Sequence, residues 1–146
     1  MTRPAPWQAR FLDQVGALTT ETGLPPSTMR VFAWLVVCEP EHQTVDELRA
    51  TLGLSAGAIS TATTTLIATG LVERTTRPGD RRHHYRLRPG GWELVLRQRL
   101  DAAARLRATA AEAIAAAPTP QPRVAEMRDF YGFFADHMAE LLAKQR

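Results

Sequence analysis

The chain has 146 residues and a mass of 16.2 kDa, a size that suits one small domain with or without helical extensions. Hydrophobic residues make up 45% of it, enough to bury a core, and the formal net charge is only +3. The single cysteine, Cys38, excludes an internal disulfide and a multi-cysteine metal site. No apolar run approaches the roughly 18 residues of a membrane span, and residues 1–10 lack the apolar region of a secretion signal. We therefore expect a cytoplasmic protein without membrane contact.

The N-terminal third is predicted to be helical. Residues 5–21 form one amphipathic helix. Its apolar stripe consists of Trp7, Phe11, Val15 and Leu18. Residues 29–39 are apolar on nearly all sides, which is typical of a central core helix, and Pro40 ends it.

The middle of the chain carries the pattern of two short helices joined by a tight turn. Thr44 and Glu47 form a capping box at the start of the first helix. Gly53 suits the left-handed position that ends this helix, and Ser55 is an N-cap candidate for the second, at residues 55–69. A helix-turn-helix needs such a turn to leave its second helix free to enter the DNA major groove.

Hydroxyls and methyls, rather than charges, line the exposed side of the helix at residues 55–69. With no Arg, Lys, Asn or Gln there, this helix lacks side chains for bidentate pairing with bases, so we expect modest direct base reading. The free N–H groups at its N-terminus are expected to face a phosphate. The candidate DNA contacts of the helix-turn-helix are Thr44, Ser55, Gly57, Ser60, Thr61, Thr64 and Thr65.

A β-hairpin with an arginine-rich tip is predicted directly afterwards. Its strands are residues 71–76 and 83–88, and Pro78-Gly79 between them suits a type II turn. Strand alternation directs Tyr85 to one face and His84 to the other. Residues 71–90 hold six arginines and two acidic residues, a net charge of +4, so the rest of the chain sums to −1. The wing at residues 77–82 is therefore expected to supply much of the DNA affinity, in the minor groove. Its candidate contacts are Arg74, Arg77, Arg81, Arg82 and His84.

The C-terminal part is predicted to be a long helix, a stiff proline-rich linker at residues 118–122 and a last helix. Apolar residues of the last helix are spaced by three and four in alternation, which is typical of a helix-pairing seam. They are Val124, Met127, Tyr131, Phe134, Met138 and Leu141.

These elements predict a mainly α (α+β) fold: a winged helix-turn-helix at residues 25–90 with a two-stranded β-wing. The helices at residues 1–24 and 91–146 would form a dimerisation region. A regulator that binds double-stranded DNA as a homodimer is the first hypothesis. The alternative is a winged-helix module that contacts a partner protein instead of DNA. The arginine-poor recognition helix favours this alternative, and the charge of the wing argues against it.

The run LGLSAGAISTATTTLIATGLVERTTRPGDRRHHYRLRP resembles the MarR superfamily of bacterial transcription regulators, and in particular its GbsR-like branch. The resemblance implies a homodimer that binds a pseudo-palindromic operator, commonly as a repressor that responds to a small ligand. It also implies that Arg82 reaches the minor groove while Asp80 helps to fix the loop. Many members carry an arginine in the recognition helix where this chain has Thr61, so base contacts do not carry over at that position.

Several other residues could carry chemistry instead of packing alone. Cys38 lies in the most apolar helix, so we expect a structural thiol rather than an oxidation sensor. Cys38 and His42 have a helical metal-ligand spacing, but Pro40 interrupts the helix and no third ligand is evident. No catalytic motif stands out, so neither an enzyme, a metal nor a cofactor is expected. Aromatic residues in the terminal helices suggest a pocket for a cationic or aromatic effector. They are Trp7, Phe11, Trp34, Trp92, Phe130, Tyr131 and Phe134.

Overall fold

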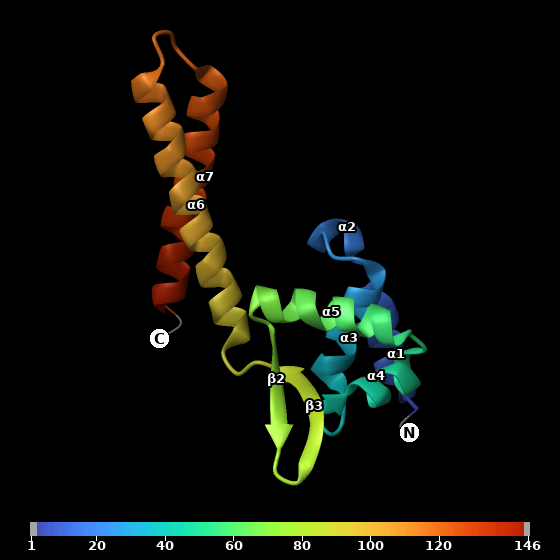
Figure 1. Cartoon of the computed structure of the whole chain (residues 1–146). Coiled ribbons are helices and arrows are strands. Elements are labelled where there is room, and N and C mark those ends of the chain that lie inside the picture. Colours follow the sequence, from blue (N-terminus) through green and yellow to red (C-terminus); the bar gives the residue numbers. More distant parts are fainter. Residues whose placement is uncertain (1–2, 145–146) are drawn as a thin grey trace. The chain divides into compact units, whose positions relative to one another are not determined.

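The computed structural model describes residues 3–144, which form two compact units that divide after Trp92 (Figure 1). Helices of the first unit are α1 (Pro6–Gly16), α2 (Thr19–Thr22), α3 (Pro26–Val37), α4 (Val45–Leu52) and α5 (Ala56–Thr69). Its strands are β1 (Gln43–Thr44), β2 (Val72–Arg77) and β3 (Asp80–Leu87). The chain continues into α6 (Gly91–Ala116) and α7 (Pro122–Lys144). The mainly helical, winged helix-turn-helix fold is confirmed.

The core of the first unit is built around α3, as its apolar sequence predicts. Val31 and Trp34 are fully buried there, and they belong to one cluster with Leu48 of α4 and Ile59 of α5. Each fully buried aliphatic side chain of this kind stabilises the fold by about 1.5 to 3 kcal/mol. Packing against α3 therefore fixes both helices of the helix-turn-helix.

Helix α1 is shorter than predicted. It ends at Gly16, and a separate short helix, α2, follows it. Because the predicted stripe is interrupted there, Leu18 is exposed, and Trp7 at the other end is exposed as well. The side chains that α1 does bury are Leu12 and Gln8, and Nε2 of Gln8 donates to the carbonyl of Val37 at 2.8 Å. This bond supplies a partner for one of the carbonyls that the end of α3 leaves free.

The sheet has three antiparallel strands in the order β1-β3-β2, whereas two were predicted. The additional strand, β1, pairs Gln43 with Tyr85 and Thr44 with His84. Strand β1 was not predicted because two residues are too few to show the alternation that marks a strand in a sequence. The turn is tighter than expected, since β3 begins at Asp80, and Gly79 adopts the positive φ of 80° that a type II turn requires.

The second unit is a hairpin of α6 and α7, which Figure 1 shows side by side. Both helices bury small residues, Ala103 and Ala110 in α6 and Gly132 and Ala135 in α7. A Cβ at position 132 would lie 3.1 Å from Nε of Arg107, so glycine permits the close approach. The predicted seam of α7 is half-buried in this unit except for Leu141, which is exposed, as are Phe130 and Phe133 beside the seam.

Helices α1 and α2 belong to the same compact unit as the predicted DNA-binding domain at residues 25–90. The role of the helices at residues 1–24 and 91–146 in dimerisation stays a prediction. Among the described residues, no single helix is both long enough and apolar enough to cross a membrane.

Candidate nucleic-acid interface

Helices α4 and α5 form the predicted helix-turn-helix. The chain bends by 112° between them, within the range of this motif. Gly53 makes the turn with a left-handed φ of 66°. The capping box is present: Oγ1 of Thr44 accepts from the N–H of Glu47 at 3.2 Å, and Oε2 of Glu47 accepts from the N–H of Thr44 at 2.9 Å. Both bonds fix the start of α4.

Thr44 was predicted as a DNA contact, and the structure places it elsewhere. Its side chain is buried, and its hydroxyl oxygen is occupied by the cap of α4. Pairing of β1 with β3 covers Thr44 on the strand side. The residue therefore holds the helix-turn-helix together without facing a ligand.

The outer side of α5 is uncharged, as predicted. Ser55 caps the helix, its Oγ accepting from the N–H of Ala58 at 3.1 Å. The side chains available to a groove lie one turn and more beyond this cap; the exposed ones are Ser60, Thr61 and Thr64, with Gly57 nearer the start and Thr65 half-buried. Hydroxyls of this kind bond phosphates or bases singly, without a bidentate match to one base.

Thr63 is a member of the same threonine run, but it is buried. Its hydroxyl donates back to the carbonyl of Ile59 at 2.9 Å, within the helix. Position 63 lies one turn after Ile59, on the side that packs against α3. The helical spacing from Ile59 would have predicted this placement.

The hairpin of β2 and β3 leaves the end of α5 and extends away from it (Figure 1). Arg77 and Arg81 flank its turn, and both are exposed, as is Arg74 further along β2. None of these three guanidinium groups has a carboxylate partner within the described residues 3–144. In contrast, Arg86 is paired with Glu73 at 2.7 Å. Uncompensated positive charge therefore lies on both sides of the turn, at Arg77 and Arg81, and at Arg74 on β2.

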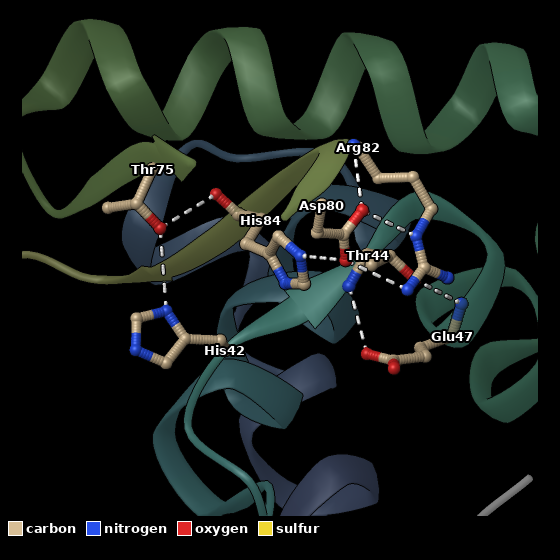
Figure 2. A network of polar contacts seen from close by, with 7 residues as sticks. All are labelled: His42, Thr44, Glu47, Thr75, Asp80, Arg82 and His84. Atoms are coloured by element: carbon tan, nitrogen blue, oxygen red, sulfur yellow. Dashed lines mark hydrogen bonds and ion pairs between the residues drawn. The ribbon is translucent and has the colours of Figure 1, made fainter. Parts of the chain in front are cut away.

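Asp80 and Arg82 form a bidentate ion pair at the base of the turn (Figure 2). Nε of Arg82 lies 3.0 Å from Oδ1 of Asp80, and Nη2 lies 2.9 Å from Oδ2. The backbone N–H of Arg82 also donates to Oδ1 at 2.9 Å. The guanidinium first, then this N–H and His84, hold the pKa of the Asp80 carboxyl far below its usual range. Asp80 is therefore ionised at neutral pH.

His84 was predicted on the outer face of its strand, and this prediction is wrong about its exposure. Only 5% of the residue is exposed, and Tyr85 beside it is buried too. Strand β3 is the central strand of the sheet, so His84 has the cross-strand neighbours Thr44 of β1 and Thr75 of β2 on either side of it. Nε2 of His84 lies 2.9 Å from Oδ2 of Asp80, and Figure 2 shows the ring pointing at that carboxylate.

The proposed effector residues do not form one cluster in the first unit. Trp34 is fully buried and donates from Nε1 to Oε1 of Gln43 at 3.1 Å, so it belongs to the core. Trp7 and Phe11 line an open groove of about 370 Å³ on α1. Trp92 is exposed. The centroid of its ring lies 5.7 Å from that of Phe32, in an edge-to-face arrangement. The remaining three aromatics lie in α7, where Phe130 and Tyr131 contact edge to face.

Cys38 is buried at the end of α3, and burial raises the pKa of its thiol to about 11. We expect the native protein to react with a disulfide reagent at pH 7.5 at least about 100-fold more slowly than the urea-unfolded chain, since the thiolate is the reactive form. Timed labelling followed by mass spectrometry checks this. Labelling of native and unfolded protein at equal rates would contradict a buried thiol. Because the folded pKa is raised, the associated stability is present below about pH 9 and is lost as the pH rises toward 11.

Comparisons with known proteins agree with this geometry. The sequence model of the MarR family matches residues 22–83, and that of the MmpR5-like MarR family transcriptional regulators matches residues 90–144. The HTH-type transcriptional regulator MmpR5 of Mycobacterium tuberculosis (strain ATCC 25618 / H37Rv) is 34% identical over 138 residues, which cover 92% of this chain and 84% of that protein. A crystal structure described as a transcriptional regulator is 34% identical and superimposes with a TM-score of 0.81, covering 97% of this chain and 100% of the other.

Proposed function

Because the chain belongs to the MarR family of transcription regulators, we propose that this DNA-binding regulator is a homodimeric, ligand-responsive repressor that acts in the cytoplasm, where its DNA is. Family membership argues against the alternative of a winged helix that contacts only a partner protein. The observation that carries the assignment of the interface is the pairing of an uncharged, hydroxyl-lined α5 with an arginine wing. Such a surface suits a duplex better than an acidic protein groove, because both its parts can contact phosphates.

In this proposal α5 enters the major groove and the wing lies in the adjacent minor groove. The capped start of α5 directs free N–H groups and the positive end of the helix dipole toward a phosphate. Ser60, Thr61 and Thr64 contact base edges and methyl groups. Arg77 and Arg81 carry the electrostatic share of the affinity.

A second copy of the chain completes the operator-binding form. Two recognition helices about 34 Å apart would read successive major grooves, which fits a pseudo-palindromic site. The aromatic face of α7 supports pairing, since Phe130 and Phe133 are each more than 60% exposed in the single chain. Exposed aromatic side chains of this size are typical of a surface that another protein covers.

The effector and the branch within the family belong to the proposal as well. A cationic, choline-type effector follows from the GbsR-like resemblance alone, whereas the relatives above are MmpR5-like. Trp7, Phe11 and Trp92 are exposed or half-buried and remain candidates for effector contact, whereas Trp34 is excluded by its burial. Trp7 and Trp92 should report binding by a change in fluorescence.

Fluorescence anisotropy with a labelled duplex from the region upstream of the protein's own gene tests the function. We expect binding at least about 10³-fold tighter than to a scrambled duplex of equal length and composition, with two chains for each duplex. The stoichiometry is measured by titration above the dissociation constant. Equal affinity for the two duplexes would contradict a specific regulator of this region.

A further inference from the structure

His84, the buried histidine of β3, has contacts that a direct contact with DNA would not explain. Nε2 of His84 lies 2.9 Å from Oδ2 of Asp80, while Nδ1 is buried without a hydrogen-bond partner in the described part of the chain. A carboxylate can only accept, so the hydrogen of this bond resides on Nε2. The ring therefore acts as a single donor directed at Asp80.

Asp80 receives donors from two opposite sides. Arg82 contributes three, its backbone N–H, Nε and Nη2, at 2.9 to 3.0 Å. His84 contributes the fourth from the interior of the sheet. Because the side chain of Arg82 is 61% exposed and that of His84 only 6%, the carboxylate links a surface cation to a fixed internal anchor. Figure 2 shows the carboxylate of Asp80 between His84 and Arg82.

The anchor itself is held by the helix-turn-helix. His84 pairs with Thr44 across the β1-β3 ladder, and Thr44 is the N-cap of α4. On the other side, the hydroxyl of Thr75 lies 3.5 Å from the carbonyl oxygen of His84 and 3.4 Å from Nδ1 of His42. The direction of the Arg82 guanidinium is thus set relative to the helices that approach the major groove.

We infer that His84 is a positioning residue for DNA binding: through Asp80 it holds the wing arginine Arg82 in the direction in which it meets the minor groove. This inference rests on the proposed role of the wing. Its signature is electrostatic. Loss of His84 removes no charge from Arg82, yet it should lower the number of phosphate contacts that the wing makes.

The test measures affinity for the upstream duplex, and its salt dependence, in H84L, H84Q, D80N and R82A. H84L should weaken binding roughly 5- to 20-fold and lower the salt slope by up to about 1, as R82A does. H84Q places an amide N–H near the position of Nε2 and should remain within about two-fold of the wild type. In the R82A background, H84L should have no further effect, because both changes act through one contact.

D80N separates positioning from charge. If net charge alone mattered, removal of a carboxylate would strengthen binding to DNA. We expect weaker binding instead, because Arg82 loses the carboxylate that orients its guanidinium. Tighter binding by D80N would overturn the inference, as would additive effects of H84L and R82A. V31A leaves a cavity in α3 and keeps the side chains of Asp80, Arg82 and His84. It controls for stability and should keep the wild-type salt slope in its folded fraction.

The results also separate this inference from the proposed function. If R82A binds the duplex as the wild type does, the assignment of Arg82 in the wing fails, and the role of His84 fails with it. If R82A weakens binding while H84L and D80N do not, the wing assignment stands and only the positioning role is overturned.

Discussion

Replacement of Trp34 by alanine is expected to lower the free energy of unfolding by about 3 to 5 kcal/mol. Trp34 is the largest fully buried side chain, in the last turn of α3. Its loss opens a cavity and also removes the donor that Oε1 of Gln43 accepts from at 3.1 Å. Gln43 belongs to β1, so the change should also loosen the pairing of β1 with β3.

Urea unfolding followed by circular dichroism measures this effect. W34F keeps one aromatic ring but loses the indole N–H and the volume of the second ring, so its loss of stability should be smaller, about 1 to 2 kcal/mol. V36A on the exposed side of the same helix is the matched control, with a change within about 0.5 kcal/mol. A loss below about 1 kcal/mol for W34A would contradict the central position of α3 in the core.

Removal of the two arginines beside the turn of the wing, in the double variant R77A/R81A, is expected to weaken DNA binding by roughly 10- to 100-fold at physiological salt. Each exposed guanidinium without a carboxylate partner can neutralise one phosphate, so the slope of log affinity against log salt should fall by nearly 2. Both side chains are exposed, so the stability of the fold should change by less than about 0.5 kcal/mol.

Anisotropy titrations between 50 and 300 mM NaCl measure the change. R86A is a useful comparison, because it removes one arginine from the same hairpin whose charge is already paired with Glu73 at 2.7 Å. The effect of R86A on the salt slope should be smaller than that of R77A alone or R81A alone. A double variant with the wild-type slope would contradict the contact of the wing with phosphates.

Local sequence signals predicted most of the fold. The capping box of Thr44 and Glu47, the left-handed Gly53 and the N-cap Ser55 each depend on residues within four positions of one another. Such signals need no knowledge of the tertiary structure. The apolar residues of α3 predicted the core for a similar reason, since a helix that is apolar on nearly all sides must be enclosed.

The errors at the site came from contacts distant in sequence. Thr44 and His84 were predicted to face DNA, and both are buried; they are cross-strand neighbours forty positions apart, and β3 lies between β1 and β2. Alternation along β3 assigns each residue to one face of the sheet, but it does not show which cross-strand neighbours surround the side chain on that face. The family resemblance implied only that Asp80 helps to fix the loop. Its ion pair with Arg82 and its contact with His84 were not predicted.

Comparison of a helix variant with a wing variant tests the division of roles between α5 and the wing most directly. T61A/T64A removes two hydroxyls from the exposed side of α5, and R77A/R81A removes two charges from the wing. Affinities are measured for the upstream duplex and for a scrambled duplex at 150 mM NaCl. We expect the wing variant to lose more affinity, and to lose it on both duplexes, whereas the helix variant loses less, and only on the upstream duplex. A larger loss for the helix variant, with the wing variant close to wild type, would contradict this account.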